Sequence, residues 1–101
     1  GFAIGVAATF GEGKDSVVGR ISPSSIKTAL CTLAGSAAGS IDAIFVSCTS
    51  LKCASIIQAA EAELGIPVIS SNSALAWDMA RLANVSFGSS INCTGKGMLF
   101  A

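Results

Sequence analysis

The chain has 101 residues, of which 51% are apolar and 12% charged, and six acidic side chains balance six basic ones. This composition fits one domain with a modest buried core. The pair Lys14 and Arg20 is too sparse to track phosphates, so we expect no nucleic-acid partner. No apolar run reaches the roughly 18 residues that span a bilayer, and no basic segment precedes the opening GFAIGVAATF. We therefore expect a cytoplasmic protein without membrane contact.

The available side chains restrict the chemistry. The chain has no histidine and no tyrosine, so acid or base catalysis must come from Cys, Asp, Glu or Lys. No CxxC pair is present, which argues against zinc. The GEGK motif at 11–14 lacks the spacing of a phosphate loop, and we expect no metal site. A chain this rich in aliphatic residues needs no disulfides, so we expect four thiols: Cys31, Cys48, Cys53 and Cys93.

The first half of the chain predicts a strand followed by a helix. Residues 2–9 (FAIGVAAT) are apolar on both faces, as in a buried strand. Ser22 followed by Pro23 marks a helix N-terminus, because the hydroxyl caps and the proline loses no needed amide. We expect this helix to end at Gly39.

The second half repeats the pattern. Residues 41–47 (IDAIFVS) are the clearest strand, followed by a helix that ends at Gly65. Residues 66–69 predict a third strand, and Asn72 predicts the N-cap of a third helix. Apolar residues share one stripe of that helix: Leu75, Met79 and Leu82.

The predicted order β-α-β-α-β-α is typical of the α/β class, with a three-layer, mostly parallel sheet. We expect a single α/β domain over residues 1–101, with the tail 84–101 docked on it. A parallel sheet of three strands needs further cover on its faces and edges. We therefore expect a partner domain or a second copy of the chain to pack here.

Cys48 is the leading candidate for chemistry because it follows a strand directly. Ligands of open parallel sheets bind at the carboxyl ends of strands, where helix N-termini also point. If a helix starts at once, the amides of Thr49, Ser50 and Leu51 are free to bind an anion or a thiolate. The alternative is that Cys48 is a small core residue. Cys53 is expected inside that helix, where a packing role is favoured over a chemical one.

The loop at residues 70–72 follows another strand. It lies beside the Cys48 loop if the two strands are neighbours, and its hydroxyls and amide then line the same pocket. The alternative interpretation is that Asn72 caps a helix and the two serines are turn residues.

The run IDAIFVSCTSLKCASIIQAAEAELGIPVISSNSALAWDMARLA resembles the C-terminal half of the aspartate/glutamate racemase superfamily. It is most similar to the branch of maleate isomerases, arylmalonate decarboxylases and ectoine-utilisation proteins. The upstream VVGRISPSSI and the terminal GKGMLF fit as well, so the resemblance covers nearly all of the chain.

The resemblance implies one half of a pseudo-symmetric two-domain fold, with an active site between the halves. Cys48 matches the C-terminal catalytic cysteine, and Thr49 and Ser50 match the segment that holds the substrate carboxylate, with Asn72 beside them. It implies a cofactor-independent racemase, isomerase or decarboxylase of small carboxylates. Thiols can serve there as base and acid, and amide donors stabilise the developing enediolate.

The other half of such a site is absent from these 101 residues, which also begin without Met. We therefore expect a fragment or processed product, association with the missing N-terminal half or a second chain, and little activity in isolation. Homo-oligomerisation is part of this expectation. The alternative is a non-catalytic ligand-binding or association module with a silent Cys48. The sequence leaves open the substrate and the choice among racemisation, isomerisation and decarboxylation.

Overall fold

The computed structural model describes residues 1–85 and 97–100. Helix α2 (Pro23–Gly35) begins where the sequence predicts, because the Ser22 hydroxyl accepts a 3.1 Å hydrogen bond from the Ser25 amide. The helix ends earlier than the predicted Gly39. At that end the Ser36 hydroxyl donates to the Leu33 carbonyl at 2.7 Å, which occupies a carbonyl of the last turn.

Two short parallel strands form the sheet. Strand β1 (Ile44–Val46) pairs with β2 (Val68–Ser70) in the register Ile44 to Val68. Helix α3 (Ile57–Leu64) connects them and ends at Gly65, whose φ of 71° is the left-handed conformation that glycine tolerates best. The predicted α/β class with parallel strands is confirmed.

The predicted strand at residues 2–9 is wrong, since residues 1–14 have no regular secondary structure. Phe2 and Ile4 are 104% and 83% exposed. A strand needs a hydrogen-bonded neighbour, and none of the described residues supplies one. The short helix α1 (Asp15–Val18) follows this segment.

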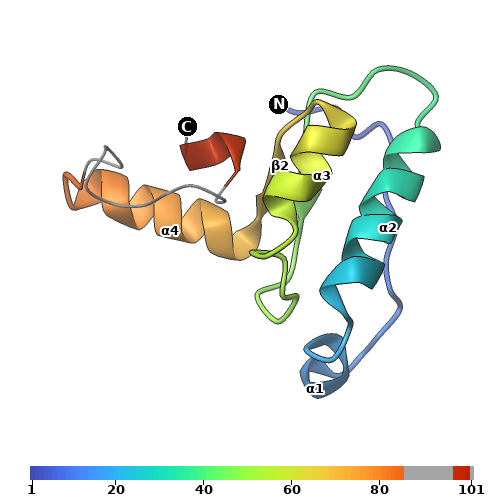
Figure 1. Ribbon diagram of the computed structural model, residues 1–101, viewed down its shortest axis with the longest axis horizontal. Coiled ribbons are helices and arrows are strands. Elements are labelled where there is room, and N and C mark those ends of the chain that lie inside the picture. The colour runs from blue at the N-terminus through green and yellow to red at the C-terminus, as the bar shows by residue number, and fades with distance from the viewer. Residues whose placement is uncertain (86–96, 101) are drawn as a thin grey trace.

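The core lies between the sheet and one helical layer. Helices α2 and α3 pack together on the same side of β2 (Figure 1). Phe45 points to the opposite face of the sheet and is 63% exposed. Of the expected three layers, the described residues therefore provide the sheet and one packed helical layer. The buried apolar residues are Val18, Ile26, Leu30, Ile44, Val46, Leu51, Cys53, Ile56, Ile57, Ala60 and Val68.

Helix α4 (Ser71–Leu82) follows β2 without a loop and extends away from α2 and α3 (Figure 1). Its N-cap is Ser70, not the predicted Asn72. Ser70 and Ser73 form a reciprocal capping box, which satisfies two amides that an Asn72 cap would leave open. The predicted apolar stripe faces solvent: Leu75, Met79 and Leu82 are 59%, 61% and 71% exposed.

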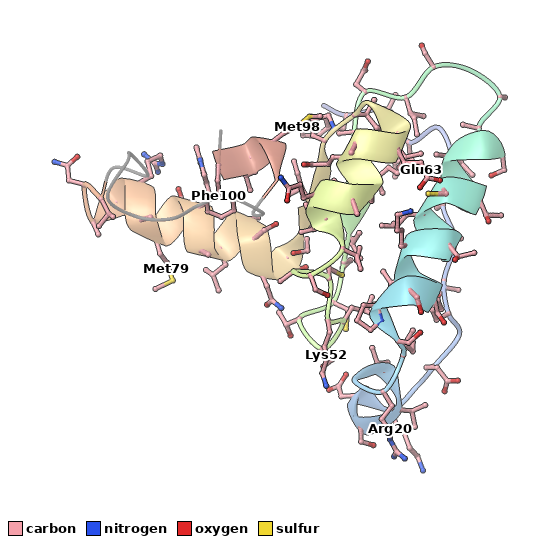
Figure 2. The ribbon with its side chains drawn as sticks, in the orientation of Figure 1. Arg20, Lys52, Glu63, Met79, Met98 and Phe100 are labelled. Carbon is pink, nitrogen blue, oxygen red and sulfur yellow. The ribbon has the colours of Figure 1, made fainter. Side chains whose placement is uncertain are left out.

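The tail predicted to dock is described in part, over residues 97–100. A short 3-10 helix, η1 (Met98–Phe100), lies against α4 and β2. Figure 2 shows Met79 pointing away from α4 on the side opposite η1. Cys93 lies outside the described residues. Within them, no helix has both the length and the apolar character needed to cross a bilayer.

Candidate functional site

Cys48 lies just beyond the carboxyl end of β1 and has an unusual backbone. Its φ is 112°, a region that residues with a Cβ rarely adopt. Such a conformation costs about 1–3 kcal/mol and is concentrated at functional sites, where the surrounding structure enforces it. The side chain is half-buried and packs against the core.

Two hydrogen bonds join the Cys48 loop to the start of α4. The Cys48 amide donates to the Ser71 hydroxyl at 3.2 Å, and the Asn72 side-chain amide donates to the Thr49 carbonyl at 2.9 Å. The sequence made this proximity conditional on neighbouring strands, and β1 and β2 do pair. The second strand-end loop therefore orients the first.

The expectation that a helix begins directly after Cys48 is wrong. Residues 49–51 form a turn, in which the Leu51 amide donates to the Cys48 carbonyl at 3.4 Å. Helix α3 starts only at Ile57, so the helix that follows the Cys48 loop does not begin at the thiol. In the described part of the chain, the amides of Thr49 and Ser50 donate no hydrogen bond. These two donors are free to bind a carboxylate.

Cys53 lies in the loop before α3, not inside the predicted helix. It is 2% exposed, which favours the predicted packing role. Burial raises the pKa of its thiol above the usual value of 9.0, and the nearby Cys48 adds to this effect. Cys53 is therefore held as a neutral thiol at physiological pH.

Cys31 lies on α2, at a different place from the strand-end loops. Burial raises its pKa, and a hydrogen bond with Glu63 acts in the same direction. Glu63 also forms an ion pair with Lys27, which lowers the pKa of the Glu63 carboxyl. This cluster joins α2 to α3 and contributes nothing to the Cys48 loop.

The structure thus groups the four predicted site residues, but it gives them different tasks. Cys48 offers a thiol, Thr49 and Ser50 offer backbone amides, and Asn72 uses its amide group to hold the loop. The sequence included the Ser71 hydroxyl among the groups of the loop at residues 70–72, but it did not predict the hydrogen bond to the Cys48 amide. Within the described residues, no three potential metal ligands gather.

Basic side chains lie at the same end of the molecule. Figure 2 places Lys52, in the Cys48 loop, and Arg20, after α1, at that end. A Cβ on Gly19 would lie 3.9 Å from the Ser50 carbonyl oxygen, so the backbone before Arg20 reaches this loop. Both basic side chains are exposed and would attract a carboxylate. The sequence gave no indication that Arg20 and Lys52 lie at the same end of the molecule.

Solved arylmalonate decarboxylases are similar to this chain in both sequence and fold. A crystal structure of arylmalonate decarboxylase matches with 30% identity and a TM-score of 0.74, over 91% of this chain and 39% of the other. The Gly74Cys mutant in a sulfate-associated form matches with 30% identity and a TM-score of 0.75, over 92% and 38%. The structure of unliganded arylmalonate decarboxylase matches with 30% identity and a TM-score of 0.71, over 90% of this chain and 38% of the other.

The chain thus spans about two fifths of the length of these decarboxylases. No curated protein sequence matches it significantly. The family model described as arylmalonate decarboxylase matches residues 11–100, which include every residue of the strand-end loops. The chain belongs to the arylmalonate decarboxylase family, within the aspartate/glutamate racemase superfamily.

Proposed function

We propose that this chain forms one wall of a cofactor-independent active site for small carboxylates, with Cys48 as the proton-donating thiol. The observation that carries the proposal is the backbone of Cys48. It lies two residues beyond the end of β1, has a φ of 112°, and its amide is bound by the Ser71 hydroxyl. A half-buried packing residue gains nothing from this strain, whereas a reacting group gains a fixed direction.

Membership of the decarboxylase family favours decarboxylation over racemisation or isomerisation. In this reaction the bond between the substrate α-carbon and one carboxylate breaks, and carbon dioxide leaves without the bonding electrons. The electron pair moves into the remaining carboxylate as an enediolate, which the amides of Thr49 and Ser50 stabilise. The Cys48 thiol protonates the carbon, and the thiolate recovers its proton from water.

The proposal leaves the other half of the pocket to a partner. This chain matches 39% of the solved decarboxylase chain, so most of that fold lies outside the matched segment. We propose that the remaining half of the fold associates with this chain. The isolated chain is expected to bind a carboxylate weakly and to lack turnover.

A second candidate function is non-catalytic carboxylate binding by the same fold. It is favoured by the packing of the Cys48 side chain against the core cluster. In that case the free amides of Thr49 and Ser50 still bind an anion, and the thiol stays inert. Thiol reactivity separates the two functions, whereas ligand binding does not.

The test is mass-resolved alkylation of the folded chain with iodoacetamide, with and without malonate. Cys48 is expected to react at least about tenfold faster than Cys53, because Cys53 is buried and neutral. Malonate is expected to slow Cys48 and to leave Cys31 unchanged, since Cys31 lies on α2. A Cys48→Ala variant identifies the labelled site. Labelling of Cys48 no faster than Cys53 would overturn the catalytic role and leave the binding function.

A further inference from the structure

Cys48 shares its loop with a second cysteine, Cys53. Backbone hydrogen bonds fold this loop on itself: the Leu51 amide donates to the Cys48 carbonyl at 3.4 Å, and the Cys53 amide donates to the Leu51 carbonyl at 3.0 Å. An extended chain would separate the two cysteine Cα atoms by about 17 Å, and a disulfide needs them within about 7 Å. The two turns shorten this span, because each reverses the chain within a few residues.

The side chains of the two cysteines face the same core. Cys53 is 2% exposed and belongs to the core cluster, and the half-buried Cys48 side chain packs against that cluster. A Coulombic interaction with Cys48 contributes to the raised pKa of the Cys53 thiol, after the larger effect of burial. Because such an interaction weakens with distance, it indicates that the two thiols are neighbours. Both cysteines are free thiols in the structure.

The two thiols differ in their access to solvent. Cys48 is half-buried, so a small solute can reach its sulfur, whereas Cys53 is enclosed by the core. Burial raises the pKa of Cys53, which keeps this thiol protonated and unreactive toward solutes at neutral pH. An accessible thiol beside an enclosed one is the arrangement of a cysteine that reacts with an oxidant and a cysteine that resolves the product.

We propose that Cys48 and Cys53 are a reversible oxidation site, in which a hydroperoxide reacts at Cys48 and Cys53 then closes a disulfide with it. The disulfide would switch off the proposed function, since it removes the proton-donating thiol. It would also enclose Thr49 and Ser50, whose free amides lie between the two cysteines. The regulatory meaning rests on the proposed function, whereas the pairing of the cysteines does not.

The chemistry needs two steps and one oxidant. In the first step the Cys48 sulfur attacks one oxygen of hydrogen peroxide, the O–O bond breaks, and Cys48 becomes a sulfenic acid while water leaves with the thiol proton. In the second step the Cys53 sulfur attacks the Cys48 sulfur, the S–O bond breaks, and water leaves with the Cys53 proton. The pair of thiols thereby loses two electrons, and the peroxide is reduced to water. A dithiol reductant reverses the change by thiol–disulfide exchange.

The experiment treats the folded, reduced chain with an equimolar amount of hydrogen peroxide, blocks the remaining thiols with iodoacetamide and digests the product with trypsin. Cleavage after Lys52 places Cys48 and Cys53 in different peptides, so a disulfide is needed to keep them together. We expect these two peptides to be joined in the main oxidation product and to separate with dithiothreitol. Fragment spectra distinguish Cys48 from Cys31, which lies in the same tryptic peptide.

Matched variants test the roles of the two sulfurs. Cys53→Ala removes the resolving thiol, so dimedone should trap Cys48 as a sulfenic acid, and the sulfinic acid should form at least about tenfold more than in wild type. Cys31→Ala is the control and should form the same disulfide, because Cys31 lies on α2. The peptide map of the wild-type chain needs no variant, so the test stands even if Cys53→Ala is unstable.

Three results would overturn the inference: a Cys48 that stays reduced, a Cys48 oxidised to the sulfinic acid while Cys53 is still alkylated, and a disulfide between Cys48 and Cys93. The malonate experiment separates this inference from the proposed function. Protection of Cys48 by malonate, together with a sulfinic acid product, would keep the proposed function and reject the pair. A disulfide between Cys48 and Cys53, without any effect of malonate, would keep the pair and reject the carboxylate site.

Discussion

Glu61 is a buried carboxylate that holds two parts of the chain together. It is 3% exposed and accepts hydrogen bonds from the Val68 amide at 2.9 Å and the Met98 amide at 2.7 Å. Gly97 approaches so closely that a Cβ there would lie 2.8 Å from the carboxylate and 2.5 Å from the Ile57 side chain. Only glycine fits, and its φ of 91° also favours glycine.

Replacing Glu61 should therefore destabilise the fold in a graded way. Glu61→Ala leaves two backbone amides without acceptors, and we expect a loss of about 2–4 kcal/mol in the free energy of unfolding. Glu61→Gln keeps one acceptor oxygen and should lose about 1–2 kcal/mol. Urea denaturation measures both. Gln58→Ala on the exposed face of the same helix is the control and should change stability by under about 0.5 kcal/mol.

Cys53 predicts how stability depends on pH. Burial raises the pKa of its thiol in the folded state above the ordinary 9.0, so the folded chain holds this proton more tightly than the unfolded chain. The resulting stability is complete below about pH 9 and is lost as the pH rises through the folded pKa.

Urea denaturation between about pH 8 and pH 10.5 tests this expectation. Cys53→Ala should flatten the decline of the unfolding free energy at the alkaline end. Cys31→Ala is the comparison: it removes a second thiol whose pKa is raised, so it should remove only its own share of the decline and leave the Cys53 contribution in place. An equal slope in wild type and Cys53→Ala would contradict the assignment.

The sequence proposes Cys48 because it follows a predicted strand and precedes Thr49 and Ser50, and its catalytic role stays a prediction. Its strained backbone and the role of Glu61 were not predicted, because both depend on contacts between residues far apart in the chain. The prediction of Asn72 as the N-cap was wrong for a related reason. Ser70 is both the last residue of β2 and the N-cap of α4, and it forms a capping box with Ser73 that the sequence pattern did not indicate.

Among the helices and strands, the ends that depend on a local cap were predicted correctly, whereas the strand that depends on a neighbouring strand was not. Helix α2 starts at its predicted cap and α3 ends at its predicted glycine, because both signals act within one turn. Residues 2–9 have strand composition, but a strand forms only beside another strand. Periodicity also places the α4 stripe correctly without saying what covers it.

Substitutions in the exposed apolar stripe of α4 should lower the free energy of unfolding less than a substitution in the core. Leu75→Gln, Met79→Gln and Leu82→Gln together should lower the unfolding free energy by under about 1 kcal/mol, because these side chains are largely exposed. Ile26→Ala in the core should cost about 2–5 kcal/mol, since Ile26 is 1% exposed. Urea denaturation compares them. A triple variant as unstable as Ile26→Ala would show that the stripe is covered in solution.

The whole molecule is less compact than its length requires. The radius of gyration is 14.1 Å, compared with about 13 Å for a compact domain of 100 residues. Helix α4 extends away from α2 and α3, and residues 1–14 form no regular secondary structure (Figure 1). Both features, together with the open face at Phe45, are surfaces that a larger assembly would use. The family could be recognised from the sequence because several of its motifs appear in order, whereas the quaternary arrangement depends on surfaces outside this chain.

The junction between β2 and α4 has a mechanical consequence. The strand ends at Ser70 and the helix starts at Ser71, so no loop lies between them to absorb a rotation. Asn72 ties the base of the helix to the Thr49 carbonyl. A small rotation of the Cys48 loop should therefore be transmitted to the base of α4 and should produce its largest displacement at the far end of the helix, near Leu82. A spin label at the far end of this helix should report ligand contact at Thr49 as a displacement.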